Sequence, residues 1–273
     1  MEAAIFFSAP AVSFWLARRL IGLYCLRGAV KPNYRGKLIA PALGPALLLG
    51  FLSAATAAIW LEDDLLPWLQ VTALFMGVSL YGSWDDFLDE PICGFKGHFR
   101  NALKGGFSAG LLKVITALPA VLIFSGSLPL SLPSRISALF LILLSANGVN
   151  LLDRRPGRAL KVFFSVALFL IFAAGPNAGA PQLLLPLMAA ALALAPLDFS
   201  AEGMLGDCGA NLLGAALGVA AVLFLQPPWQ LFFIAAWGAV NLVSERISIS
   251  RIIEKNSLLR YLDGLGREEE KLT

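Results

Sequence analysis

The sequence predicts an all-α membrane protein, a polytopic helical bundle with about nine transmembrane helices. Of its 273 residues, 58% are hydrophobic and 14% are charged, whereas a soluble domain carries about 25% charged residues. The 16 prolines and 25 glycines suit membrane helices, which tolerate both residues better than soluble helices do. Lysines and arginines lie between alternate apolar runs. Together these observations exclude an ordinary soluble domain and favour a chain that crosses the membrane repeatedly.

Nine apolar segments can be drawn along the chain. Several are shorter than the roughly 20 residues that a straight span needs, so their boundaries are approximate. The first run lacks a basic segment before it and is followed by arginines, so we expect a retained helix and not a cleaved signal. An odd number of spans places the termini on opposite sides. The segments are 3–21, 39–60, 65–82, 107–125, 135–152, 160–175, 182–198, 210–226 and 229–243.

The basic residues set the predicted orientation, because lysine and arginine accumulate in cytoplasmic loops. With the N-terminus outside, all of the 21 lysines and arginines except Arg135 fall on the inner side. Residues 1–243 then form a single transmembrane domain. Residues 244–273 form a cytoplasmic tail that is amphipathic at helical spacing, and we expect this tail to lie along the inner membrane surface.

Two adjacent carboxylates, Asp85 and Asp86, stand where the apolar run 65–82 ends. Acidic side chains at the edge of a membrane helix are costly, which makes them a site hypothesis. Neighbouring carboxylates repel each other unless a cation lies between them, and hard oxygen ligands favour Mg²⁺. The alternative is a solvated helix cap facing the cytoplasm.

A second polar stretch contains Asn147, Asn150 and Asp153 at positions i, i+3 and i+6. This spacing places all three near one face of a helix. Asparagines inside an apolar run need hydrogen-bond partners, and intramembrane polar residues favour a functional interpretation. The alternative is a polar seam between packed helices.

A third stretch places Asp207 between glycines, immediately before the apolar run 210–226. Glycines let the backbone approach a ligand closely, and the helix that follows offers its N-terminal amides to an anion. The alternative is an ordinary glycine-rich turn. Further along the same helix, Gly214 and Gly218 predict close helix packing. All three polar stretches fall on the predicted cytoplasmic side, as one site assembled from several loops requires.

Taken together, these stretches resemble the polyprenyl-phosphate N-acetylhexosamine-1-phosphate transferases, membrane enzymes that start lipid-linked glycan and peptidoglycan assembly. The resemblance covers roughly residues 31–218 and includes the first basic loop and Lys113, which is similar to the lysine that follows the acidic pair in the family. Taken alone, Lys113 could equally be a lysine that reaches the lipid headgroups. The family carries DDxxD or DDxxK, NxxNxxD and GDxGS motifs in this order. Here they read DDFLD (Asp85, Asp86, Asp89), NGVNLLD (Asn147, Asn150, Asp153) and GDCGA (Asp207, Gly209).

The sequence also departs from the family pattern. A second aspartate usually follows the NxxNxxD motif, but here Asp153 is followed by RRPGR. Ala210 replaces the serine of the third motif. The late histidine-rich loop of several members is absent, and SERISISR stands there with Arg246 and Arg251 as residues that could meet a phosphate.

The resemblance implies a Mg²⁺-dependent enzyme of the cell membrane that moves a sugar 1-phosphate from a UDP-sugar to polyprenyl (undecaprenyl) phosphate and releases UMP. The expected partners are this lipid, the nucleotide sugar and the membrane; a homodimer is left open, and no nucleic-acid partner is expected. A non-catalytic relative and a membrane transporter are the alternatives, with a CDP-alcohol phosphotransferase a weaker one. The implied catalytic residues are Asp85, Asp86 and Asp153, the metal ligands are Asp207 and Asp86, and the substrate-binding residues are Asn147, Asn150, Lys113, Arg246 and Arg251.

Overall fold

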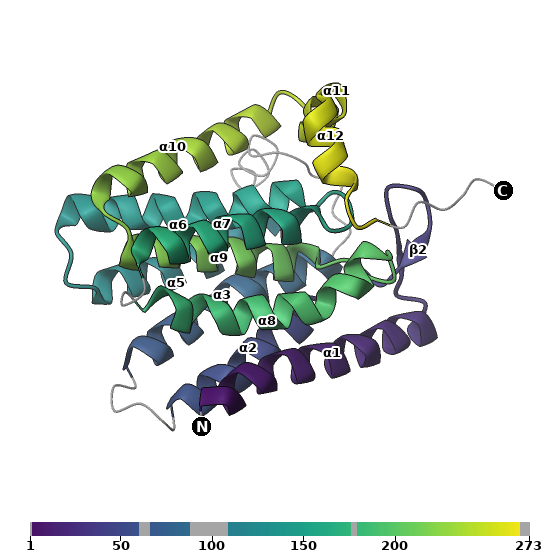
Figure 1. The fold of residues 1–273 in the computed structure, drawn as a ribbon, viewed down its shortest axis with the longest axis horizontal. Helices are drawn as coiled ribbons and strands as arrows, with labels where there is room; N and C mark the ends of the chain where they lie inside the picture. Colours follow the sequence, from purple (N-terminus) through teal and green to yellow (C-terminus); the bar gives the residue numbers. More distant parts are fainter. Residues whose placement is uncertain (1, 60–65, 88–108, 176–178, 268–273) are drawn as a thin grey trace.

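The computed structural model describes residues 2–59, 66–87, 109–175 and 179–267, and these ranges form eleven helices and one short β-hairpin (Figure 1). The predicted all-α class is therefore confirmed for the described part of the chain. The elements are α1 (Glu2–Arg27), β1 (Lys31–Pro32), β2 (Leu38–Ile39), α2 (Gly44–Ile59), α3 (Leu66–Phe87), α5 (Ala109–Ser127), α6 (Leu132–Leu152), α7 (Arg158–Ala174), α8 (Ala180–Phe199), α9 (Gly206–Phe224), α10 (Pro227–Ser244), α11 (Ile249–Lys255) and α12 (Ser257–Gly264).

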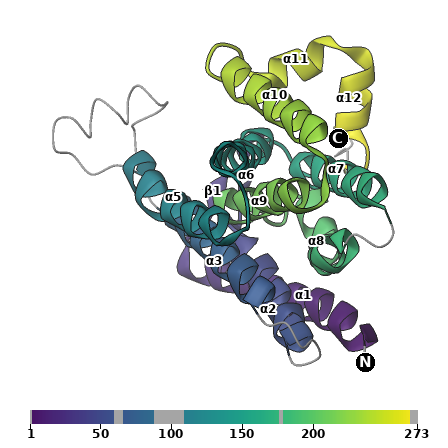
Figure 2. The same cartoon turned by 90° about the vertical axis from the view of Figure 1, so that its left-hand side faces the viewer.

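Helix α9 is the centre of the bundle, with α3, α6, α7 and α8 around it (Figure 2). Nearly every residue from Gly206 to Val222 is buried. Its glycines and alanines let neighbouring backbones approach closely. A Cβ atom at Gly214 would lie 2.3 Å from the carbonyl oxygen of Ser145, and one at Gly218 would lie 2.4 Å from Ser145 Oγ. The prediction that these glycines serve helix packing is confirmed, and the partner is α6.

Within the described ranges, three helices, α6, α8 and α9, are long and apolar enough to cross a membrane, and α10 with α11 makes a fourth if this pair, bent by 99°, is one span. These helices indicate a membrane protein. The predicted nine spans are not supported by the described residues. Helices α2 and α7 have 16 and 17 residues, and a rise of about 1.5 Å per residue makes them shorter than a hydrocarbon core of about 30 Å.

One end of the bundle gathers the β-hairpin, the loop 153–157 and the loop 200–205, and we call it the hairpin end (right-hand side of Figure 1). The chain after β2 runs parallel to the chain before α9. Gly44 N–H donates to Leu205 O at 2.9 Å, and Met204 N–H donates to Ala40 O at 3.0 Å. These backbone bonds fix the start of α9 against the start of α2.

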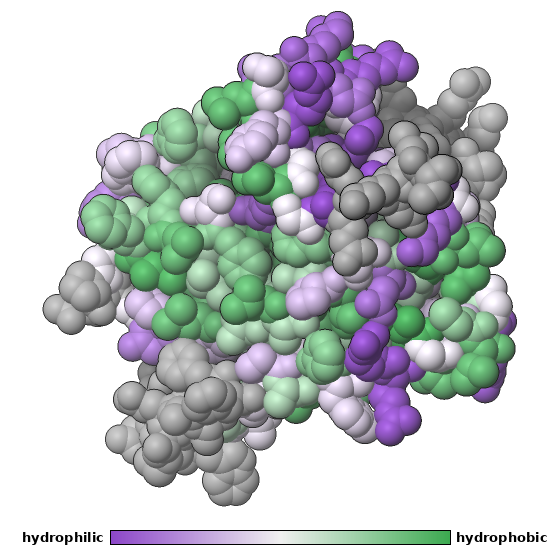
Figure 3. Space-filling view, turned by 45° about the vertical axis from the view of Figure 1, so that its right-hand side comes forward, coloured by the Kyte–Doolittle hydropathy of each residue, from purple (hydrophilic) through white to green (hydrophobic). Residues whose placement is uncertain are grey.

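The face of the molecule drawn in Figure 3 is largely apolar over its middle. Hydrophilic side chains gather at the top of the view, where α11 and α12 lie, and in a strip at the lower right. A broad apolar surface is what contact with a bilayer requires.

Candidate active site

Asp86, in the last turn of α3, caps the N-terminus of α9. Its Oδ1 accepts a hydrogen bond from Asp207 N–H at 2.7 Å, and its Oδ2 accepts one from Cys208 N–H at 3.1 Å. The first N–H groups of a helix have no partner within the helix, and this end of the helix dipole is positive. A carboxylate from a helix 121 residues earlier therefore stabilises the start of the central helix.

Two glycines allow Asp86 to reach this position. Gly82 lies one turn before Asp86 on the same face of α3, and a Cβ there would lie 2.5 Å from both Cα and N of Cys208. Gly206 has φ of +70°, and a Cβ there would lie 2.7 Å from both Asp86 carboxylate oxygens. A larger residue at Gly82 would push α3 away from the backbone of α9, and one at Gly206 would displace the Asp86 carboxylate.

Asp153 meets the same helix terminus from α6. It is the C-cap residue of α6, and its N–H bonds to the carbonyl oxygens of Val149 and Asn150. Its carboxylate accepts a hydrogen bond from Gly206 N–H. Burial raises the pKa of Asp153 well above its usual range, and the negative charges of Asp198, Asp207 and Asp86 raise it further. Asp198, Asp207 and Asp86 therefore lie within electrostatic reach of Asp153.

Asp198, in the last turn of α8, is a member of this site that sequence reasoning missed. It is 1% exposed, and its Oδ2 accepts a hydrogen bond from Gly157 N–H at 2.7 Å. Its carboxylate also accepts the Leu205 N–H. An aspartate inside the apolar segment 182–198 was the available signal, because such residues are rare in membrane helices. We call the four residues Asp86, Asp153, Asp198 and Asp207 the carboxylate cluster.

The cluster changes one expectation for α9. Its amides from Leu205 to Cys208 were expected to be offered to an anionic ligand, but they donate to the chain's own carboxylates. The start of α9 is therefore an internally capped helix whose surroundings are negative. Positive charge comes from Lys31 on β1, which acts electrostatically on Asp86.

No family model matches this chain. The resemblance to the transferases therefore depends on the three sequence motifs alone.

Asn147 belongs to a polar contact between α6 and α10. Its Nδ2 donates to Asn241 Oδ1 at 2.5 Å, and Asn241 Nδ2 donates to the carbonyl oxygens of Leu144 and Trp237 at 3.0 and 2.8 Å. This arrangement corresponds to the polar seam that was the alternative interpretation. Asn150 is half-buried one turn before Asp153, so it lies closer to the carboxylate cluster than Asn147 does along α6.

The structure does not connect the other predicted site residues with the cluster through any contact of the described side chains. Arg246 and Arg251 are exposed, and in the described part of the chain neither forms a hydrogen bond with a cluster carboxylate. Asp85 lies in α3 and Lys113 in α5, but their side chains are outside what the structure describes, as is Asp89 altogether.

Two cluster members fit the predicted Mg²⁺ ligands. Among the described residues, no three His, Cys, Asp or Glu side chains are placed to share a metal. Magnesium, however, usually keeps several waters and takes one or two carboxylates together with substrate phosphates. Asp86 and Asp207 supply hard oxygens at one helix terminus. The amide bonds on Asp86 leave further lone pairs on its oxygens, so this donor set suits the ion.

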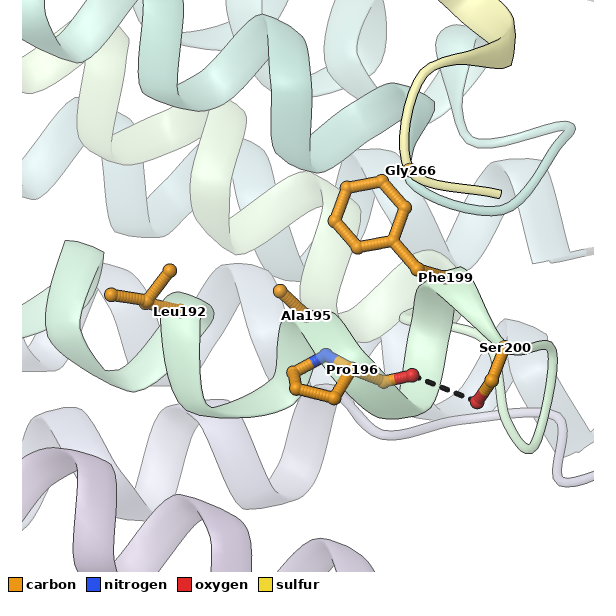
Figure 4. A pocket seen from close by; sticks show the side chains of 6 residues that line it. All are labelled: Leu192, Ala195, Pro196, Phe199, Ser200 and Gly266. Atoms are coloured by element: carbon orange, nitrogen blue, oxygen red, sulfur yellow. Dashed lines mark hydrogen bonds between the residues drawn. The ribbon is translucent and has the colours of Figure 1, made fainter. Parts of the chain in front are cut away.

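An apolar pocket of about 350 Å³ lies against the last two turns of α8 (Figure 4). Its one hydroxyl, that of Ser200, is bonded to Pro196 O at 2.8 Å. The pocket therefore offers little to a nucleotide or a diphosphate. It is lined by Leu192, Ala195, Pro196, Phe199, Ser200 and Gly266.

Proposed function

We propose that this chain is a Mg²⁺-dependent membrane transferase that moves a sugar 1-phosphate from a UDP-sugar to a polyprenyl phosphate and releases UMP. In this role it starts lipid-linked glycan synthesis for the cell envelope. One observation carries the proposal: Asp86, Asp153 and Asp207, each from a different motif, meet at the N-terminus of α9. Because the three residues come from separate motifs, their meeting at one point fits a shared site.

The chemistry requires two polyanions to approach each other. Asp207 and Asp86 would hold Mg²⁺, which supplies charge neutralisation and stabilises the phosphoryl oxygens during transfer. Asp85 would orient or deprotonate the lipid phosphate, while Asp153 and Asn150 would position the nucleotide diphosphate. Because the α9 amides are already occupied, attraction of phosphate falls to basic side chains such as Lys31, Lys113, Arg246 and Arg251.

The proposed topology places the hairpin end in the cytoplasm and the N-terminus outside, in the cell membrane. Support comes from charge: Arg18, Arg155 and Arg267 belong to the hairpin end, whereas Arg135 starts α6 at the opposite end. The shorter helices would cross by local thinning of the bilayer, which costs only fractions of a kcal/mol per Å of mismatch.

A non-catalytic relative is the second candidate, and the hydrogen bonds favour it. The carboxylates of Asp86 and Asp198 both cap backbone amides, so each has a structural role without any substrate. The structure gives no support to a transporter function. The cluster lies at one end of the bundle, whereas transporter sites lie near the bilayer midplane.

The test is UMP release by purified protein in lipid, with undecaprenyl phosphate, Mg²⁺ and a panel of UDP-sugars. We expect Asp207→Asn and Asp86→Asn each to abolish release. Glu202→Gln is the matched control, because Glu202 is an exposed carboxylate of the same end that pairs with Arg18. Full turnover by both aspartate variants would contradict the assignment, and thermal unfolding of each variant separates lost chemistry from lost folding.

A further inference from the structure

We propose that Arg158 and Asp263 are positioning residues of this site, acting through a C-terminal strap that comprises residues 249–267. The strap would hold the loop 153–157, and hence Asp153, against the other three carboxylates of the cluster. This inference deepens the proposed function and rests on it for its kinetic part, while its structural part is testable alone.

The first observation is a buried ion pair between the strap and the start of α7. Arg158 Nε and Nη2 donate to the two oxygens of Asp263 at 2.7 and 2.9 Å, and its Nη1 donates to Ser250 Oγ at 2.9 Å. The side chains of Arg158 and Asp263 are only 4% and 9% exposed. Two parallel hydrogen bonds fix the orientation of the guanidinium relative to the carboxylate as well as their distance, whereas a lysine ammonium group cannot form such a pair.

Two further basic residues contact the strap, and we call these contacts, together with the Arg158–Asp263 pair, the clamp. Arg267 Nη2 donates to Asp263 Oδ1 at 2.7 Å, and its Nε donates to Pro156 O at 2.8 Å. Lys161 Nζ donates to the carbonyl oxygens of Leu262, Asp263 and Leu265 at 3.0, 2.6 and 2.9 Å. These carbonyls lie at the C-terminus of α12, where a cation is favourable.

The clamp connects directly to the carboxylate cluster through Gly157. This residue stands between Pro156 and Arg158, both held by the strap, and its N–H donates to Asp198 at 2.7 Å. Its φ of +74° and a Cβ position 1.9 Å from the Phe199 ring leave no room for another residue. Asp198 in turn accepts the Leu205 N–H at the start of α9. The path from strap to site is therefore continuous.

This path accounts for the RRPGR segment, which replaced an expected acidic motif. Three residues of this segment bind the strap. Arg155 forms an ion pair with Glu254, the carbonyl oxygen of Pro156 accepts a hydrogen bond from Arg267, and Arg158 forms an ion pair with Asp263. In this chain the segment after Asp153 has become the docking site for the C-terminal helices.

The test compares two carboxylates of the strap that pair with arginines of the same segment. Asp263→Asn breaks the buried pair, whereas Glu254→Gln breaks a pair whose partners are 27% and 49% exposed and is the matched control. Arg158→Lys, which keeps the charge but loses the fork, is a milder second variant. The first readout is the alkylation rate of the buried Cys208 thiol in full-length protein carrying Cys25→Ser and Cys93→Ser.

We expect Asp263→Asn to speed Cys208 alkylation about tenfold or more, as loss of a buried charged hydrogen bond should, and Arg158→Lys to have an intermediate effect. Glu254→Gln should change the rate less than about twofold, as is usual for an exposed ion pair. In the UMP assay, Asp263→Asn should lower kcat about tenfold with little change in KM, because small displacements of reacting groups mainly reduce turnover.

Unchanged Cys208 alkylation in both Asp263→Asn and Arg158→Lys would overturn the inference, as would equal effects of Asp263→Asn and Glu254→Gln. If the parent protein releases no UMP with any UDP-sugar while alkylation responds as expected, the strap's coupling to the site stands and the transferase proposal fails. If the parent is active and Asp263→Asn keeps its kcat, the positioning role falls and the transferase proposal remains.

Discussion

Asp86 shows how one side chain in this protein combines a structural with a proposed chemical role. Its two oxygens cap α9 at Asp207 and Cys208, and in the proposed mechanism the same oxygens hold a metal. Substitutions at Asp86 should therefore separate the two roles, because asparagine remains a good helix cap but is a poor ligand for a hard cation.

For this residue we predict that Asp86→Ala lowers the free energy of unfolding by about 1–2 kcal/mol, the usual loss for a missing helix cap. Asp86→Asn should lose much less, because its amide oxygen still accepts one N–H. Denaturant or thermal unfolding in a mild detergent measures both, with Glu202→Ala as an exposed-carboxylate control. Equal stability of Asp86→Ala and the parent would show that the cap contributes nothing.

At the scale of elements, the close approach of α6 to α9 determines where the second and third motifs meet. Gly214 and Gly218 lie directly against Ser145, and Asp153 follows at the end of the same α6 helix. Any change that separates these helices should also move Asp153 away from the start of α9.

We predict that Gly214→Ala destabilises the protein by about 1–3 kcal/mol, the range for overpacking a tight contact. Gly22→Ala in α1 is the matched control, since nothing lies within 4 Å of its Cβ position. There the same substitution should stabilise by about 0.5–1 kcal/mol through helix propensity alone. Similar unfolding midpoints for the two variants would contradict the close packing.

At the scale of the whole molecule, an acid-sensitive contact links the strap to the bundle. Burial pushes the pKa of Asp263 upward, but hydrogen bonds from Arg158 and Arg267 and their charges outweigh it and lower the pKa to about 2. A carboxyl whose pKa is lower in the folded state stabilises above its unfolded value and loses this contribution as pH falls.

We therefore predict that strap docking is complete above about pH 4, the ordinary range of an aspartate, and is lost as pH falls toward 2. Pepsin cleavage near Leu258 and Leu262, two exposed residues of α12, should accelerate across this window. The Asp263→Asn variant should be cleaved readily even at the upper edge of this pH window. A parent protein equally resistant at both pH values would rule out this linkage.

How far the sequence predicts this molecule depends on the range of the interactions involved. Apolar runs report burial in lipid or in a core, so the all-α class was predictable. The nine spans were not supported, because hydropathy cannot distinguish a short span from a buried helix such as α2. The carboxylate of Asp198 was missed because it lies outside any motif. The pairing of Arg158 with Asp263 spans 105 residues and leaves no local periodicity.

The Arg158–Asp263 pair also has a consequence for the order in which the protein matures. Asp263 leaves the ribosome 105 residues after Arg158, and chains fold from the N-terminal side during synthesis. Until then the guanidinium of Arg158 lacks its counter-ion at a position that becomes buried, which is unfavourable. The loop beside Asp153 should therefore stay open to water until the strap emerges, so that the polar centre is assembled only after the strap has been made.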